Sequence, residues 1–187
     1  MRHPIALAFT LLALTAPMAR ADQKLVPTQS QINFTSKQMG VPVNGNFRKF
    51  DAQVVFEPKK PETAKIALTI DLASASLGSA ETEVELAKPD WFNTKAFPQA
   101  TFQSTTVTST GAGSFNVVGK LSIKSISRDL TVPVTLVQAG GNTTASGKFS
   151  IKRLDFKIGD GDWKDTSMVA DPVEVSFKLV LTGVGPL

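Results

Sequence analysis

The sequence predicts an all-β fold, an eight-stranded antiparallel barrel with one short helical insertion. Apolar and polar residues alternate in short segments from Gln31 to Thr182, which is the period of a strand with one buried and one solvated face. We distinguish eight such segments, most of them joined by short turns. Eight antiparallel strands can close into a barrel that fills its own interior or holds one small ligand. A two-sheet sandwich satisfies the same periodicity and stays open as an alternative.

The first three strands precede the insertion, and Ile32 and Phe34 mark the first of them. In the long second strand the inward parity changes between Phe47 and Phe50. This change indicates one inserted residue and a β-bulge near residues 48–49. The third strand alternates most clearly, with the inward residues Ala64, Ile66, Leu68, Ile70 and Leu72.

A helix is expected between the third and fourth strands. Ser79 can cap its start, and Pro89 limits its end. The residues between include Glu81, Glu83 and Glu85, which are strong helix formers. The insertion is therefore short.

Five more strands follow the helix, and glycine-rich turns at residues 111–113 and 140–142 separate some of them. Pro133 has the outward parity of the sixth strand and lacks a backbone N–H, which implies an unpaired position or an edge strand. The five strands are expected over residues 100–108, 115–123, 130–136, 145–151 and 173–181.

An outer-membrane barrel shows the same alternation with its apolar face outward. Such barrels carry girdles of Trp and Tyr at the membrane interfaces. This chain has two Trp and no Tyr. The composition therefore favours a barrel whose apolar face points inward.

Residues 1–21 are expected to be a signal peptide, followed by one domain over 22–187. Ile5–Ala16 is an apolar run too short to span a bilayer, and Ala19–Ala21 is a small-x-small cleavage site. No later segment is long and apolar enough to span a membrane, and no cysteine can accept an N-terminal lipid. We expect a periplasmic protein whose mature chain begins at Asp22.

Removing residues 1–21 also removes His3, so the mature chain has no His, Cys or Tyr. Nucleophiles activated by histidine and metal sites built on imidazole or thiolate are therefore excluded. The S-x-x-K arrangement and the glycine-rich phosphate loops are also missing. Only carboxylates and lysines remain for catalysis. We expect no catalytic residues, no metal and no cofactor.

The charge of the mature chain names no partner. Without Arg2 and Arg20, the mature chain has 18 basic and 16 acidic residues, which gives a net charge of +2. The densest basic run, Lys59-Lys60, has no aromatic residues interleaved. We expect no nucleic-acid partner.

Four aspartates near the C-terminus resemble a calcium loop: Asp160, Asp162, Asp165 and Asp171. Lys164 and the missing glycine before Asp165 break the register of such a loop. A solvated hairpin is the favoured interpretation.

The segment Asp90–Pro98 is rich in aromatic residues although it lies outside every predicted strand. It holds Asp90-Trp91-Phe92-Asn93 and Phe97-Pro98, and it leads into Ala100–Ser104. Other motifs complete an ordered set: Gly45-x-Phe47, Phe50-Asp51-Ala52, Gly119–Lys124, Arg128-Asp129 with Val132-Pro133, Lys152–Phe156 and Val169–Val173. Over nearly the whole mature chain, this set resembles the YceI family of bacterial polyisoprenoid-binding proteins.

The resemblance implies an extended, lipocalin-like barrel whose elongated apolar cavity holds an isoprenoid or a similar lipid. Members of the family are typically exported. Ser125 and Lys157 stand where the family usually has glycine, and both are expected in turns. Lys157 would add a charge near one end of the barrel, where the head group of the ligand could differ.

The predicted function is binding of an elongated apolar ligand, as carrier, store or sensor. The expected partner is a polyisoprenoid, an isoprenoid quinone or another long-chain apolar lipid. The alternative is a barrel enzyme that acts on a lipidic substrate through an inward carboxylate or lysine. The inward positions are overwhelmingly aliphatic or aromatic, which favours binding. Pairing of two copies stays open.

Candidate ligand contacts come from the aromatic segment and from inward strand positions. Four of the aromatic candidates fit equally well as core residues that plug one end of the barrel: Trp91, Phe92, Phe97 and Phe102. The full set of candidates is Phe34, Trp91, Phe92, Phe97, Phe102, Leu121, Val134, Phe149 and Phe177.

Overall fold

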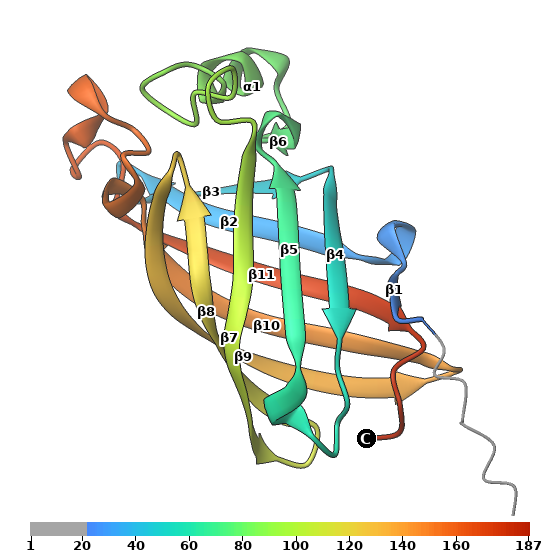
Figure 1. Ribbon diagram of the computed structural model, residues 1–187. Helices are drawn as coiled ribbons and strands as arrows, with labels where there is room; N and C mark the ends of the chain where they lie inside the picture. Colours follow the sequence, from blue (N-terminus) through green and yellow to red (C-terminus); the bar gives the residue numbers. More distant parts are fainter. Residues whose placement is uncertain (1–21) are drawn as a thin grey trace, which may run out of the picture.

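One antiparallel sheet makes up most of the structure, a computed structural model that describes residues 22–187 (Figure 1). One α-helix and five short 3-10 helices complete it. The strands are β1 (Lys24–Leu25), β2 (Gln31–Gln38), β3 (Val41–Phe47), β4 (Phe50–Val55), β5 (Lys65–Asp71), β6 (Ala75–Ser76), β7 (Gln99–Gly111), β8 (Ser114–Ile123), β9 (Ile126–Ala139), β10 (Asn142–Lys152) and β11 (Pro172–Thr182). The helices are α1 (Ala80–Leu86), η1 (Pro27–Gln29), η2 (Pro61–Thr63), η3 (Leu72–Ser74), η4 (Arg153–Phe156) and η5 (Gly161–Lys164).

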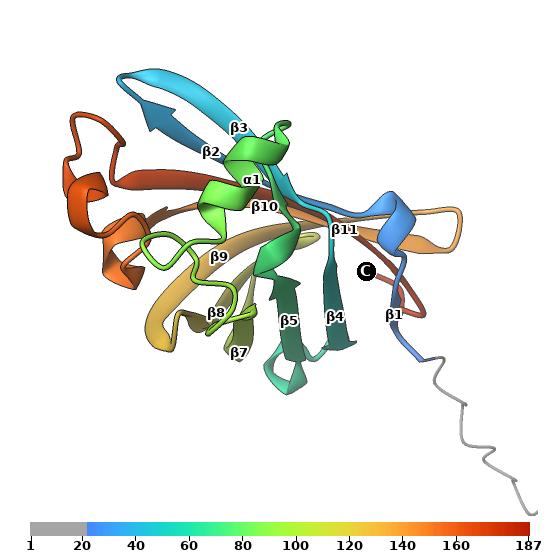
Figure 2. The same cartoon turned by 90° about the horizontal axis from the view of Figure 1, so that it is seen from above.

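The hydrogen-bonded path of the sheet runs β4-β5-β7-β8-β9-β10-β11-β2-β3-β6, and β1 adds to β11. Seen from above, the sheet curls, so that β2, β3, β10 and β11 lie across from β4, β5, β7 and β8 (Figure 2). The all-β antiparallel class is thereby confirmed. The count of eight strands is not, because the second predicted strand divides into β3 and β4 and the short β1 and β6 are added.

The second predicted strand is divided between β3 and β4, where we expected a bulge. β3 pairs with β2 and β6, whereas β4 pairs with β5. Residues 48–49 therefore carry the chain from one end of the sheet path to the other. The backbone amides of Arg48 and Asp71 and the hydroxyl of Ser74 hold this bend against η3, with the bonds Arg48 N–Ser74 O of 3.1 Å and Asp71 N–Lys49 O of 3.0 Å.

The side chain of Arg48 ties the same bend to α1. Its guanidinium donates to Glu83 and to the hydroxyl of Ser76, with distances of 2.7 Å from Nη2 to each. The hydrogen bond from Ser76 lowers the pKa of Glu83 more than burial raises it, and Arg48 lowers it further. The helix is where the sequence predicts it. Its expected cap is not, because the side chain of Ser79 makes no capping hydrogen bond.

Pro133 marks a change of pairing inside the sheet. β9 lies between β8 and β10, so the expected edge strand is wrong. The ladder between β9 and β10 covers residues 135–139 of β9 and stops before Pro133, which has no N–H to donate. The alternative expectation, an unpaired position, agrees with this register.

Two apolar clusters occupy the interior, one at each end of the long strands. The first lies near α1 and includes Leu72, Leu86, Trp91, Phe92, Phe156 and Ile158. The second lies at the other end and includes Phe56, Val107, Phe115, Val117, Val132 and Leu136. Phe102 and Leu130 pack against both clusters.

Three glycines in the sheet lie beneath phenylalanine rings of neighbouring strands. A Cβ atom built on Gly45 would lie 2.3 Å from Cζ of Phe34, and the same test brings Gly119 to 2.5 Å from Phe102 and Gly147 to 2.7 Å from Phe177. A ring that covers a glycine restores the packing that a strand loses where it has no side chain. The sheet therefore depends on glycine at these three positions.

Gly119→Ala is expected to lower the free energy of unfolding by about 2 to 3 kcal/mol, because overpacking forces a shift of neighbouring groups. The new Cβ would lie 2.4 Å from the backbone oxygen of Gln103, which cannot move aside as a side chain can. Urea unfolding measures the change. Gly111→Ala is the control, since no atom lies within 4 Å of its added Cβ. Equal stability of the two variants would contradict this packing.

Candidate functional site

A cavity of about 150 Å³ lies inside the curled sheet. Its wall is built by inward side chains of β2, β4, β5, β7, β8, β9, β10 and β11. Alternation along each strand places every second residue on this wall. The cavity is therefore a direct product of the sequence period.

The wall is almost wholly apolar. Among the described residues that line the cavity, Thr101 is the one polar side chain, and none is ionisable. The others are aliphatic or aromatic: Ile32, Ala52, Val54, Phe56, Ile66, Leu68, Ile70, Phe102, Val107, Phe115, Val117, Leu121, Leu130, Val132, Val134, Leu136, Ala145, Phe149, Val175, Phe177, Leu179 and Leu181. Such a wall holds a molecule by burial and shape, with no charged group to orient it.

Five of the nine candidate residues lie together on this wall. They come from five neighbouring strands, one each from β7, β8, β9, β10 and β11. All have the inward parity of their strand. They are Phe102, Leu121, Val134, Phe149 and Phe177.

The other four candidates lie outside the wall. Trp91 and Phe92 are buried in the cluster near α1, where they close that end of the sheet. The ring of Phe34 covers Gly45 and lies 5.3 Å from the ring of Phe47. Phe97 is half-buried in the loop before β7. For Trp91 and Phe92 the structure therefore agrees with a plug of core aromatics.

The indole of Trp91 belongs to this plug in an unusual way. Its ring centroid lies 5.3 Å from that of Trp163 in η5. Within residues 22–187 its Nε1 is the single buried side-chain nitrogen or oxygen that lacks a hydrogen-bond partner. The packing of these two rings thus joins the aromatic plug of Trp91 and Phe92 to η5.

Arg153 holds together the segment of residues 153–171, which contains η4 and η5, from its buried side. Its side chain is 1% exposed. All five of its N–H groups donate to backbone carbonyls, at 2.6 to 3.2 Å, from Ile158, Gly159, Trp163, Val169 and Ala170. Burial lowers the pKa of the guanidinium, and the charge of Asp171 opposes that shift. Arg153 belongs to the motif Lys152–Phe156, but the sequence predicts no role for its side chain.

Lys124 holds the plug from the turn between β8 and β9. Its ammonium donates to the backbone oxygens of Pro89, Trp91 and Lys157, at 3.0, 2.7 and 2.7 Å. Burial lowers the pKa of Lys124, and the charges of Asp160 and Asp90 oppose the shift. One side chain therefore joins three segments at the closed end.

The expected turns at Ser125 and Lys157 are confirmed. Their φ angles are +61° and +54°, in the left-handed region that favours glycine. Lys157 contributes its carbonyl to Lys124 and does not line the cavity. A contact between its charge and a ligand head group in the cavity therefore has no support in this geometry.

The acidic segment is not the predicted hairpin. It forms η4, η5 and turns that wrap around Arg153. Asp160 pairs with Lys164 at 2.8 Å, and Asp165 accepts from the amide and hydroxyl of Ser167. These bonds are the leading causes that lower the pKa of each carboxyl. Over the described part of the chain, no three acidic or histidine side chains are placed to hold a metal ion.

Several wall residues were missed as candidates although the parity signal was present. Val54, Phe56 and Phe115 have the inward parity of β4 and β8, and they line the cavity near its second cluster. Parity alone was the better guide to the wall.

Comparison with known proteins gives consistent matches. The sequence profile of the YceI-like domain matches residues 23–181. Protein YceI of Escherichia coli O17:K52:H18 is 28% identical over 169 residues, which cover 84% of this chain and 88% of that protein. In residues 22–187, no helix is long and apolar enough to cross a membrane.

Solved structures share the fold. The crystal structure of Burkholderia cenocepacia BcnA superposes with a TM-score of 0.81 and 45% identity, over 83% of this chain and 98% of that one. A domain from Saccharophagus degradans, described as polyisoprenoid binding, superposes with a TM-score of 0.71 and 16% identity, over 87% and 98% of the two chains. The second likeness concerns the fold alone.

Proposed function

Because the chain belongs to the YceI-like family, we propose that it binds a lipid-like apolar molecule, a polyisoprenoid or isoprenoid quinone, inside the curled sheet. The observation that carries the proposal is the wall, where Thr101 is the one polar side chain among the described lining residues. Removing apolar surface from water supplies about 0.8 kcal/mol for each buried CH₂. The description of the Saccharophagus degradans domain supports the same ligand class.

The same wall supports binding over catalysis. An enzyme acting on a lipidic substrate needs a carboxylate, a lysine or another reactive group beside the reacting atoms. The described lining residues supply none. The protein would act on its ligand by shielding it from water, as carrier, store or sensor.

The size of the cavity sets how much of a tail it holds. A cavity of about 150 Å³ is of the size known to hold one benzene molecule. A long isoprenoid tail therefore requires the two halves of the sheet to separate further. The affinity for a long tail should therefore depend on how far the two halves of the sheet can separate.

Titration with isoprenoid alcohols of increasing length tests the proposal. Association costs on the order of 4 to 15 kcal/mol, so the shortest tails are expected to bind weakly. Affinity is expected to rise with each added isoprene unit and to level off once the tail outgrows the interior. Calorimetry or displacement of a fluorescent lipid gives the dissociation constants. Affinity independent of tail length, or turnover of the added lipid, would refute the proposal.

Export is part of the same proposal. Residues 1–21, which carry the expected signal, lie outside the described residues, so this part depends on their sequence alone. A periplasmic protein that starts at Asp22 would meet its ligand beside a membrane. The intact mass of the mature protein checks the cleavage site.

A further inference from the structure

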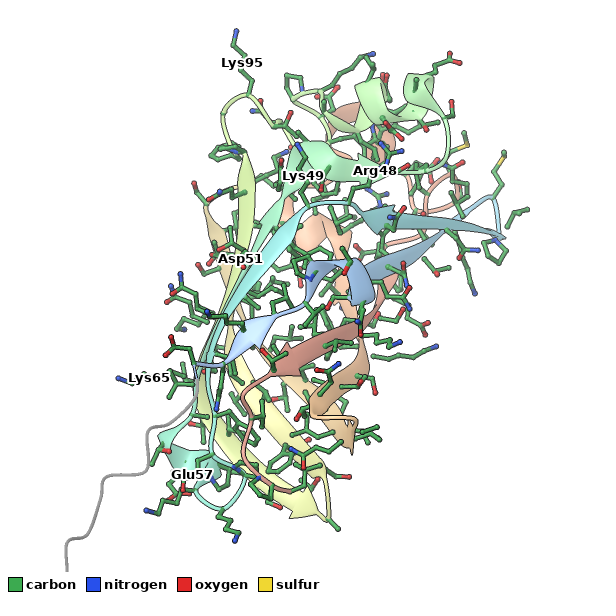
Figure 3. All side chains as sticks on the ribbon, turned by 90° about the vertical axis from the view of Figure 1, so that its right-hand side faces the viewer. Arg48, Lys49, Asp51, Glu57, Lys65 and Lys95 are labelled. Atoms are coloured by element: carbon green, nitrogen blue, oxygen red, sulfur yellow. The ribbon has the colours of Figure 1, made fainter. Side chains whose placement is uncertain are left out.

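A second hollow lies where the two ends of the strand path approach each other, beside β3 and β4. It is a groove of about 500 Å³ between η1 and the bend that joins β3 to β4. Figure 3 looks onto this side and labels Arg48 and Lys49 at the bend. The groove is lined by Pro27, Ser30, Gln31, Asn46, Phe47, Arg48, Lys49 and Phe50.

The groove lies over a seam in the sheet. β4 pairs with β5 along one edge, and in the described chain no strand pairs with its other edge. The bend at residues 48–49 closes the seam at one end. At the other end the side-chain amide of Gln23 closes it, donating to the backbone oxygen of Phe56 at 2.6 Å and accepting from its N–H at 2.8 Å. Between these two closures the wall has no backbone ladder.

The far side of the seam is fixed in place. The hydroxyl of Ser30 donates to the backbone oxygen of Val26 at 2.8 Å and accepts from the amide of Val180 at 2.9 Å. The first bond closes η1 on itself, and the second attaches η1 to β11, together with a bond from the amide of Val26 to the backbone oxygen of Val180 at 2.8 Å. One side of the seam is therefore η1, which hydrogen bonds attach to β11, and the other side is β4, which pairs with β5 alone.

The groove adjoins the apolar cavity through the sheet. Gln31 lines the groove and Ile32 lines the cavity. On β4, Phe50 lines the groove, and Ala52, two residues on and of the same parity, lines the cavity. A lipid whose tail lies in the cavity can therefore place its polar head group in the groove.

The groove carries positive charge. Its two charged residues are Arg48 and Lys49. Arg48 is paired with Glu83, whereas the ammonium of Lys49 has no described hydrogen bond or ion pair. Lys49 is also exposed, so it can turn toward an incoming group at low cost.

We propose that this groove is the portal of the cavity and that Lys49 binds an anionic head group, such as a phosphate, attached to the apolar tail. The proposal rests on the binding function proposed above. The tail passes through the seam beside β4, while the head group remains in the groove. A lysine ammonium is a compact point charge suited to phosphate.

The test compares geranylgeranyl phosphate with geranylgeraniol, which share one tail and differ in head group. We expect the protein to bind the phosphate about fivefold more tightly at low salt, with the preference falling as salt is added. Lys49→Glu is expected to weaken the phosphate about tenfold and to change the alcohol less than about twofold. Lys49→Gln should give a smaller loss than Lys49→Glu.

Lys65→Glu is the matched control. Lys65 is exposed at the far end of β5 and lies away from the bend in Figure 3, so the same charge change should leave both ligands unaffected. Thermal melting checks that each variant folds.

The outcomes separate this proposal from the binding function. Failure of the protein to bind either lipid would overturn both. If both lipids bind and Lys49→Glu weakens the phosphate no more than the alcohol, the portal proposal fails while the proposed binding function stands. Displacement of the lipid phosphate by millimolar inorganic phosphate would identify a free-phosphate site and overturn it too.

Discussion

Phe102→Asp is expected to abolish binding of an isoprenoid alcohol and to lower the free energy of unfolding by about 3 to 5 kcal/mol. Phe102 lines the cavity, packs against both apolar clusters and covers Gly119. An aspartate there would lose this packing. Its carboxylate would also face a wall in which Thr101 is the one described polar side chain.

Denaturant unfolding and lipid titration measure the two losses. The control is Gln103→Asp, which adds the same charge one residue along β7 at an exposed position. That variant should keep its stability within about 0.5 kcal/mol and bind normally. Wild-type stability and binding in Phe102→Asp would show that the ring does not face the interior.

Arg153→Met is expected to lower the free energy of unfolding by about 3 to 5 kcal/mol, because buried carbonyls that lose their donors are costly. Five backbone oxygens between residues 158 and 170 depend on this guanidinium. A methionine fills similar space and offers no N–H. The melting temperature should fall by about 10 °C in a domain of this length.

Two further variants make this result specific. Arg153→Lys keeps the charge and has three donors in place of five, so its loss should be intermediate. Arg128→Met removes an exposed arginine that makes one local backbone contact, and it should change stability by less than about 0.5 kcal/mol. A small effect of Arg153→Met would show that water can replace the guanidinium.

The sheet could be predicted from the sequence because the two-residue period is local. The alternation on β5 places Ile66, Leu68 and Ile70 on the cavity wall as expected. The break at residues 48–49 could not be predicted as a break. A parity change looks the same in a bulged strand and in two strands, and only their partners, β2 for β3 and β5 for β4, distinguish the cases.

The candidate site could be predicted in part for the same reason. Phe102, Phe149 and Phe177 lie on strands, where parity decides the face. Trp91 and Phe92 lie outside the strands, so parity says nothing about them. The role of Arg153 depends on carbonyls as far as 17 residues away in the chain, which no local pattern reveals.

The place of β11 in the sheet bears on the order in which the protein folds. Strands β4 to β10 pair along the sheet in the order in which they are synthesised, with β6 set aside, and β2 pairs with β3. β11 alone joins these two groups, between β10 and β2. A chain in which residues 172–182 are not yet folded therefore holds two groups of strands with no strand pairing between them and with exposed apolar faces. Formation of the enclosed interior must therefore wait until β11 pairs with both β10 and β2, and a chain that has lost residues 172–182 cannot form it.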